Sequence, residues 1–300
     1  MRGTLHRYAY LSIGAAVVTI ALKGLAYLLT GSVGLLSDAV ESLVNLAAAL
    51  VALTALIIAA RPPDESHEYG HDKIEYFSSG IEGTLILVAG VSIIATSIDR
   101  LLRPHAVEQI GIGLGLSVLA SLVNFGVAMV LDRVGRANDS VTLQADAHHL
   151  MTDVWTSVGV LTGLIVVGIS GVTWLDPVIA LVVALNILRI GIVLLRKSVD
   201  GLMDTPIPEP ERRAVEGVIH KFETSGIQFH ALRTRQSGAR RFISVHVLVP
   251  PRWTVKQAHD VVEDIEREMR AVVPHSRVFT HLEPQGDPAA FDDLGLDRPE

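Results

Sequence analysis

The chain has 300 residues, a formal net charge of −7, 49% hydrophobic residues and only 19% charged residues. This composition is too apolar for an ordinary soluble domain and indicates a membrane protein. The negative charge argues against a nucleic-acid-binding protein. Cysteine is absent, which excludes disulfides, thiolate metal ligands and a cysteine nucleophile.

Six apolar runs are long enough to cross a bilayer, at residues 8–29, 35–60, 74–102, 107–131, 141–169 and 174–195. The first has no small-residue cleavage site, so we expect a retained membrane helix rather than a signal peptide. Basic residues gather in the loops after the second and fourth runs and at both ends of the region, which places these sides in the cytoplasm. Arg100 and Arg103 lie on the opposite side and weaken this assignment without reversing it. Residues 1–205 are therefore predicted to form an all-α, six-helix transmembrane domain.

From Pro206 the composition becomes that of a soluble domain. Helices are predicted at residues 209–223 and 254–272, and strands at 228–234, 241–249 and 277–282. The order αββαβ predicts a small α+β domain at 206–284, with its helices on one face of a mixed sheet. Residues 285–300 are rich in Pro, Asp and Gly and are predicted to be disordered.

Two of the apolar runs repeat one polar pattern, in which further polar groups follow an aspartate after three and seven residues. It comprises Asp38, Glu41 and Asn45 in the second run and Asp146, His149 and Asp153 in the fifth. In a helix each set shares one face, and ionisable groups within a membrane indicate function. If the two helices face each other, Glu41, Asn45, His149 and Asp153 surround one point and form a metal site with nitrogen and oxygen donors. Asp38 and Asp146 are equally suited to support these ligands or to lie at helix N-termini.

The alternative is that these polar residues only hold helices together or bind a bridging water. That explains one Asn or His. It does not explain several buried carboxylates, which require a cation or protons to neutralise them.

Two other groups could bind metal. Asp64, His67 and His71 lie within eight residues in the loop after the second run and could close on one divalent ion, although a solvated polar loop is an equally good interpretation. The soluble domain has further candidates near strand ends and helix starts: His230, His246, His259, His281 and Glu283. For these five residues, spacing alone does not favour a metal site over the usual explanation, which is histidines scattered on the surface.

Several strings resemble motifs of the cation diffusion facilitator family of divalent-metal/proton antiporters, especially its bacterial zinc- and iron-exporting branch. The strings are Ser37-Asp-Ala-Val-Glu-Ser-Leu-Val-Asn45, Asp64-x-x-His67-x-x-Gly-His71-x-Lys73-x-Glu75, Ala145-Asp-x-x-His149-x-x-x-Asp153 and His230-x-Leu-Arg-Thr-Arg-Gln-Ser-Gly238. The resemblance covers nearly the whole chain. The last string is specific, so it strongly favours a functional role for the histidines of the soluble domain over a chance distribution.

This resemblance implies a homodimer in a bacterial inner membrane, with both termini cytoplasmic and a metallochaperone-like cytoplasmic domain. It assigns Glu41, Asn45, His149 and Asp153 to a transport site, Asp64, His67 and His71 to a loop site, and His230, His246, His259, His281 and Glu283 to a binuclear site at the dimer interface. It also matches Lys73 and Asp204 to an interlock near the membrane surface. Members usually have His or Asp at the position of Glu41 and Asp at that of Asn45, so this chain departs from the pattern in the second run.

The function expected is proton-coupled export of a divalent cation by alternating access, with Zn²⁺ as the first candidate and Fe²⁺, Mn²⁺, Co²⁺ or Cd²⁺ as others. The metal ion would be both substrate and regulatory ligand, and protons would be the counter-ion. One alternative is a membrane-bound metal sensor or scaffold that does not transport, in which Asn45 marks a degraded site. An intramembrane metallohydrolase needs an open metal site with a general base and is not favoured, so we do not expect an enzyme.

Overall fold

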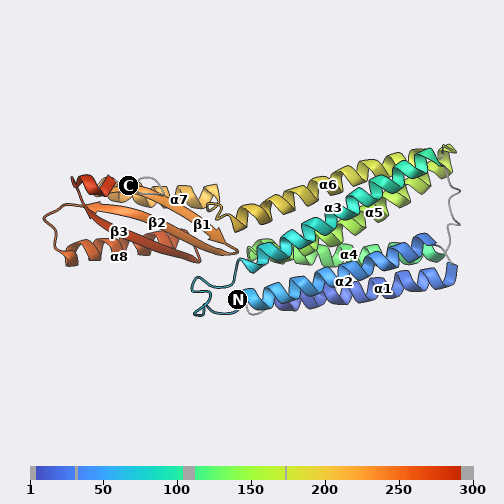
Figure 1. Cartoon of the computed structure of the whole chain (residues 1–300), viewed down its shortest axis with the longest axis horizontal. Coiled ribbons are helices and arrows are strands. Elements are labelled where there is room, and N and C mark those ends of the chain that lie inside the picture. Colours follow the sequence, from blue (N-terminus) through green and yellow to red (C-terminus); the bar gives the residue numbers. More distant parts are fainter. Residues whose placement is uncertain (1–4, 31–32, 104–111, 173, 292–300) are drawn as a thin grey trace. The chain divides into compact units, whose positions relative to one another are not determined.

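The computed structural model of the chain describes residues 5–30, 33–103, 112–172 and 174–291 (Figure 1). Within this part, the side chains of residues 33–41, which include Asp38 and Glu41, lie outside the description. The chain divides into two compact units, residues 1–199 and 200–300. Each unit is described by itself.

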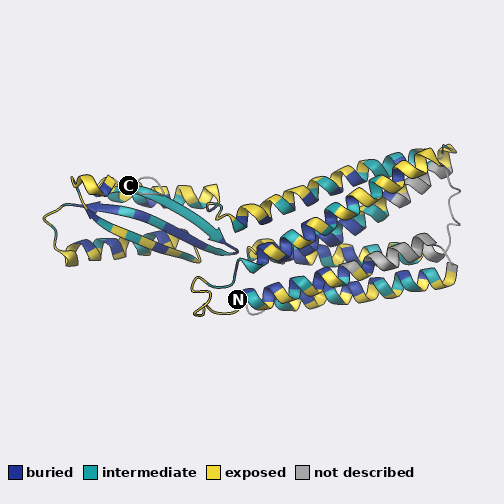
Figure 2. Cartoon of the chain, viewed as in Figure 1, coloured by how far each residue is buried: buried dark blue, intermediate teal, exposed yellow. Residues whose placement is uncertain are grey.

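The first unit consists of six long helices. They are α1 His6–Thr30, α2 Val33–Ala59, α3 Ile74–Leu102, α4 Ile112–Ala137, α5 Val141–Ser170 and α6 Leu175–Leu202. Within the described residues, segments of α1, α3, α4 and α6 are long and apolar enough to cross a membrane, and α2 adds the apolar stretch Asn45–Ala59. Exposed residues follow the outer sides of these helices (Figure 2). Many of them are large and apolar, as Leu28, Val88 and Val182 are, which suits a surface that faces lipid.

Helices α1, α2, α4 and α5 pack against one another, and α3 packs against α2 and α5. Helix α6 approaches α3 closely through glycine. A Cβ atom at Gly83 would lie 3.2 Å from the backbone nitrogen of Leu195, and one at Gly191 would lie 3.2 Å from the carbonyl oxygen of Gly83. Ser198 adds a hydrogen bond of 2.6 Å from its hydroxyl to the carbonyl oxygen of Tyr76. Small residues at such contacts let membrane helices associate without a hydrophobic driving force.

Two helices extend beyond the apolar runs that predicted them. Helix α4 continues past Leu131 to Ala137 because Asp132 and Arg136 lie one turn apart and form an ion pair of 2.8 Å. Helix α6 continues past Leu195 to Leu202. Polar residues end an apolar pattern, but they do not end a helix that leaves the hydrocarbon region.

The second unit contains α7 Glu209–Glu223, β1 Gln228–Ser237, β2 Arg240–Val249, α8 Val255–Val272, β3 Ser276–Pro284 and the 3-10 helix η2 Pro288–Phe291. The sheet has the order β1-β2-β3, with β1 antiparallel and β3 parallel to β2. Both helices pack on one face of the sheet, as Figure 1 shows. The predicted six-helix membrane domain and αββαβ domain are thus confirmed.

Local sequence explains these elements. Thr254 caps α8 in a capping box with Gln257, and α8 buries Ala258, Val262, Ile265 and Met269 against the sheet. Pro288–Phe291 form η2 within the segment whose composition predicts disorder, and residues 292–300 lie outside the described residues.

Candidate metal sites

A buried polar cluster joins α2 and α5 in the membrane domain. His149 Nε2 lies 2.7 Å from Asn45 Oδ1, and because an amide oxygen only accepts, the imidazole donates this hydrogen bond. Asn45 Nδ2 in turn donates to Asp153 Oδ2. The exposed fractions of Asn45, His149 and Asp153 are 3%, 5% and 5%. Three of the four predicted ligands therefore meet at one buried point.

Asn45 links the other two residues of this cluster, because its amide oxygen accepts a hydrogen bond from the imidazole and its amide nitrogen donates one to the carboxylate. His149 Nδ1 is buried and has no hydrogen-bond partner among the described residues. The imidazole therefore keeps an uncommitted nitrogen, and neutral imidazole nitrogens and carboxylate oxygens are common metal ligands. The positions of Asp38 and Glu41 fall on residues whose side chains lie outside the description.

Sequence reasoning missed Asn124 of α4, whose Nδ2 donates to Asp153 Oδ2 at 3.2 Å. Asn124 is 2% exposed. A single amide in the middle of an apolar run is itself a signal, because a polar group at membrane depth needs a partner. The sequence contains that signal, but it does not say which helix the amide faces.

The loop between α2 and α3 brings its three predicted ligands together. Asp64 Oδ1 lies 3.2 Å from His67 Nδ1, and Asp64 Oδ2 lies 3.2 Å from His71 Nε2. Ligand atoms from the three residues all lie within 4.8 Å of one another, a spacing that could hold a metal ion. Asp64 and His67 are more than half exposed, whereas the His71 side chain is only 8% exposed.

Backbone geometry and charge organise this loop around Asp64. Its Oδ1 accepts hydrogen bonds of 3.0 Å from the Ser66 N–H and 2.8 Å from the His67 N–H. Slight desolvation raises the pKa of Asp64. The hydrogen bonds from His67 and Ser66 and the charge of His71 outweigh it and hold the pKa below its ordinary value. The Asp64 carboxyl is therefore ionised across the physiological range.

The segment His67-Glu68-x-x-His71 also has the spacing of a zinc-hydrolase motif. That motif requires a helix, which would place both imidazoles on one face. Residues 64–72 instead form turns and an isolated bridge between Asp64 and His67. The carboxylate that completes this group is that of Asp64, and Glu68 is exposed. The loop therefore lacks the geometry of a hydrolase site.

In the second unit Glu283 joins three histidines. Its Oε2 lies 2.6 Å from His230 Nε2, and its Oε1 lies 3.3 Å from His246 Nδ1 and 3.7 Å from His281 Nε2. Glu283 is 7% exposed, and His230, His246 and Glu283 form a group that could hold a metal ion. The donor set of imidazoles and one carboxylate suits Zn²⁺ and other borderline divalent ions.

Strand register explains this convergence. His230 pairs with His246, and His246 pairs with His281 across the sheet. On β2, Val245 and Val247 point into the helix-covered core, so His246 between them points to the opposite face. His259 is exposed on α8, the helix side of the sheet, and no described contact joins it to the other three histidines.

Phe291 and Asp204 also make side-chain contacts in the second unit. The ring of Phe291 in η2 stacks on His230, with ring centroids 5.5 Å apart. Asp204 has a positive φ of 57° and accepts a contact of 3.2 Å from Arg235, while Lys73 precedes α3 in the other unit.

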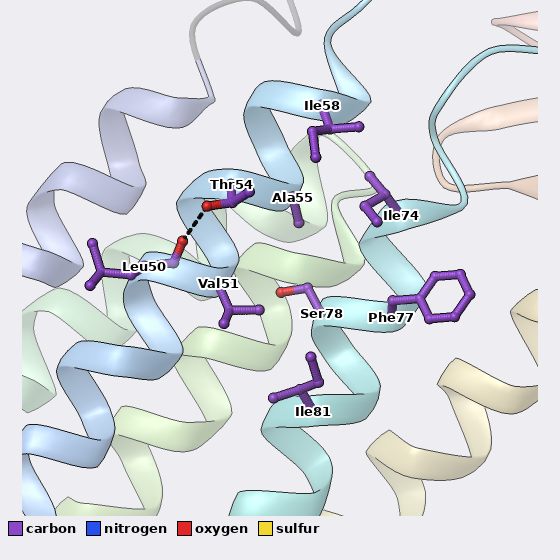
Figure 3. Close-up of a pocket in the computed structure, with 9 residues that line it drawn as sticks. All are labelled: Leu50, Val51, Thr54, Ala55, Ile58, Ile74, Phe77, Ser78 and Ile81. Atoms are coloured by element: carbon purple, nitrogen blue, oxygen red, sulfur yellow. Dashed lines mark hydrogen bonds between the residues drawn. The ribbon is translucent and has the colours of Figure 1, made fainter. Parts of the chain in front are cut away.

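A pocket between α2 and α3 lies apart from these clusters (Figure 3). Its lining includes no titratable side chain and consists of Leu50, Val51, Thr54, Ala55, Ile58, Ile74, Phe77, Ser78 and Ile81. It therefore offers no ligand set for a cation.

A six-helix membrane domain with a buried polar cluster, followed by a small domain with a histidine cluster, defines a membrane protein of the metal-transporter class. The chain belongs to the cation efflux family: residues 9–203 match its transmembrane domain and residues 207–285 match the cytoplasmic domain of cation efflux proteins. It is therefore a cation efflux transporter and not an enzyme. It is an integral membrane protein whose C-terminal domain is cytoplasmic.

Relatives agree with this assignment. The chain is 49% identical over 284 residues to a protein of Synechocystis sp. named as an uncharacterized transporter, covering 95% of this chain and 92% of that protein. It is 30% identical over 281 residues to the cation-efflux pump FieF of Salmonella arizonae and of Salmonella agona, with 93% of this chain and 92% of each relative covered. The resemblance drawn from the sequence motifs is confirmed.

Proposed function

We propose that the protein exports a divalent cation from the cytoplasm by alternating access, in exchange for protons. The observation that carries this proposal is the buried contact among Asn45, His149 and Asp153, at which an imidazole and a carboxylate meet within the membrane domain. Metal binding requires neutral imidazole, so a proton and the metal ion compete for His149. Its ordinary pKa lies where modest shifts cross physiological pH, which suits it to the exchange.

Zn²⁺ is the first candidate substrate, and Fe²⁺, Mn²⁺, Co²⁺ and Cd²⁺ follow. One nitrogen donor with carboxylate and amide oxygens accepts Zn²⁺ and also suits the harder ions. The test is flux into proteoliposomes with a pH gradient, in which a metal-sensitive dye inside reports each of the five ions in parallel. Uptake of one ion that depends on the gradient and is lost in Asp153→Ala is the expected result. Equal uptake by Asp153→Ala would contradict the assignment of this site.

A second candidate is a sensor that binds metal but does not transport it. Asn45 favours this candidate, because a neutral amide that is hydrogen-bonded to both neighbouring ligands can carry no proton. It predicts no flux of any ion while the cytoplasmic cluster still binds metal. The discriminating variant is Asn45→Asp, which supplies an ionisable oxygen: appearance of flux in this variant alone would favour the sensor.

For the cytoplasmic domain we propose a regulatory metal site at a homodimer interface. The sheet face that bears the histidines also exposes His281 and the large apolar Phe279, with exposed fractions of 61% and 49%. Exposed apolar residues beside unsaturated ligands suit a second copy of the chain. His259, which points away from its own cluster, would serve the shared site from the other copy. Residues 207–285 also match a cytoplasmic domain family associated with dimerisation.

Sedimentation and metal analysis of the full chain test this interface. Unmodified protein is expected to be dimeric, and His259→Ala is expected to remain dimeric while it retains less metal per chain. A monomer under all metal conditions would contradict the homodimer. Unchanged metal content in His259→Ala would remove His259 from the site.

The cytoplasmic location of both termini follows from loop charge and is part of the proposal. The bacterial inner membrane and the interlock of Lys73 with Asp204 are implied only by the family resemblance, and they stay predictions. Metal occupancy in the cytoplasmic domain would draw two copies together and bias the membrane domain between two states.

A further inference from the structure

A pair of carboxyl groups lies buried in the membrane domain outside the cluster of Asn45, His149 and Asp153. Glu82 of α3 is 0% exposed and Asp146 of α5 is 1% exposed. Helices α3 and α5 pack against each other, so the two carboxyl groups come from neighbouring helices. Around them, Ile86 of α3 and Ala145 of α5 belong to one apolar cluster that also includes residues of α6. The pair is therefore buried beside an apolar part of the bundle.

Hydrogen bonding leaves this pair incompletely satisfied. Glu82 Oε1 accepts a hydrogen bond of 3.2 Å from the Ser78 hydroxyl, and Asp146 Oδ1 accepts one of 3.0 Å from the Ser12 hydroxyl. The other oxygens, Glu82 Oε2 and Asp146 Oδ2, are buried and have no hydrogen-bond partner among the described residues. Two buried carboxylates with two unpartnered oxygens lack both a neutralising charge and a donor.

No basic side chain in the described surroundings supplies that charge. On the packed elements, α2 has no titratable residue between Asn45 and its end, and α4 has none from residue 115 until Asp132. On α1, Arg7 is exposed, and Lys23 lies about 16 Å along the helix from Ser12. On α6, Arg189 is exposed and Lys197 donates to Gln144 at 2.8 Å.

Two titratable groups on the same helices as the pair, Glu75 and His149, are already engaged. Glu75, two turns before Glu82 on α3, accepts hydrogen bonds from the Ser140 hydroxyl at 2.5 Å and the Thr142 N–H at 3.4 Å. His149, one turn after Asp146 on α5, donates to Asn45. Neither is bonded to the pair by any described contact.

We propose that Glu82 and Asp146 form a buried carboxyl pair that holds one exchangeable proton. Two like charges in a site of low dielectric cannot both remain ionised, and one proton removes a charge while it supplies the missing donor. A divalent cation fits less well, because it needs more ligands than two carboxylates.

The position of the pair suggests its use in transport, and this step rests on the proposed function. Asp146 lies three residues before His149 and seven before Asp153, on the same face of α5. Asn45 carries no proton where related proteins usually have a carboxylate. A buried carboxyl pair that holds a proton beside the metal ligands restores an acidic group to the membrane domain without placing it in the ligand set.

Infrared spectroscopy of the full chain in lipid at neutral pH tests the proton directly. The expected result is a carbonyl band of a protonated carboxylic acid that shifts in D₂O and disappears in Glu82→Gln. Asp146→Asn serves as the second variant, in case one substitution prevents folding. Asp99→Asn is the matched control, since Asp99 is an exposed carboxyl on the same helix, and it should retain the band. Absence of the band from unmodified protein, or its persistence in both variants, would overturn the proposal, as would its loss when Zn²⁺ is added to Asp153→Ala.

The link to transport has a separate readout. Simultaneous dyes for metal and for protons in proteoliposomes give the protons moved per ion, and Glu82→Gln should lower this ratio while metal binding at equilibrium is unchanged. An unchanged ratio overturns the link. If neither the unmodified protein nor any variant transports an ion while the infrared band behaves as expected, the proposed export function fails and the buried carboxyl pair is still supported.

Discussion

The membrane cluster and the cytoplasmic cluster both gather candidate metal ligands, but they differ in the secondary structure that positions the ligands and in the donor atoms. In the membrane domain, helices from two repeats of a polar pattern bring one imidazole and one carboxylate together, and a neutral amide bonds to both. In the cytoplasmic domain, three strands bring three imidazoles around one carboxylate. The first site is poor in nitrogen and buried, whereas the second is rich in nitrogen and open on one side through His281. A site that must release its ion suits the weaker ligand set, and a site that senses the ion suits the stronger one.

The sharpest test of this contrast is His149→Gln. Glutamine can donate a hydrogen bond to Asn45 but cannot titrate, so metal flux should fall at least tenfold, as a rough expectation for a lost ligand. The residual flux should no longer vary between about pH 5 and 8, the range in which histidine titrates. Proteoliposome flux at several pH values measures both effects.

The neighbouring histidine provides the matched control. His148 is only half-buried and makes none of the contacts in the cluster of Asn45, His149 and Asp153. His148→Gln should therefore keep both the rate and its pH dependence. If the two variants behaved alike, His149 would lose its assigned role.

Glu283→Gln tests the cytoplasmic cluster. The substitution keeps the shape of the side chain but removes the charge that faces three imidazoles, so metal affinity of the cytoplasmic domain should fall about tenfold or more. Calorimetry in a background that carries both Asp153→Ala and Asp64→Ala removes the other two candidate sites and isolates this one. Glu268→Gln, which alters a surface pair with Lys221, should leave the affinity unchanged, and equal losses in both variants would refute a specific role for Glu283.

A smaller effect is expected from Asn124→Ala. This change removes one of the two amide donors to Asp153 Oδ2 and leaves Asn45, His149 and Asp153 in place, so affinity at the membrane site should fall by about tenfold, the lower end for partners that orient a ligand. Metal titration of the full chain gives the value. An affinity equal to that of unmodified protein would mean that Asn45 alone orients Asp153.

The smallest predicted change concerns Phe291→Ala. Loss of the stacked ring on His230 should remove about 0.5–1 kcal/mol of aromatic stabilisation, equivalent to a few-fold lower affinity at the cytoplasmic cluster. Stopped-flow metal release should become faster by a similar factor. A release rate that stays constant would show that η2 contributes nothing to this site.

Much of the architecture follows from the sequence because two periodicities dominate it. Apolar runs of bilayer length predict the helices, and the repeated spacing of three and seven residues predicts that Asn45, His149 and Asp153 share a location. Alternation on β2 and the cap at Thr254 predict the second domain. Each of these signals is local, except that the shared location also needs the assumption that the polar faces of the second and fifth helices meet.

Other features depend on which faces meet, and a single sequence does not state that. Asn124 and Glu82 are isolated polar residues in apolar helices, so their partners are known only when the helices are packed. His259 looks like the other histidines in the sequence, yet it lies on the helix side of the sheet. The ends of α4 and α6 differ from the apolar runs because helices continue into polar surroundings.

An irregularity in β1 also constrains how this domain can change. Between His230 and Arg233 the pairing with β2 shifts, since three steps on β1 match two on β2, and Ala231 takes a positive φ of 50°. Such a bulge inserts one residue, so that His230 and Arg233, three positions apart, both lie opposite side chains of the same face of β2. Deletion of Ala231 would leave two steps on each strand between these pairs, and His230 could still lie opposite His246 and beside Glu283. A change of one residue in length can therefore be tolerated at the bulge, whereas the same change in the regular part of β1 would turn the side chains beyond it to the other face.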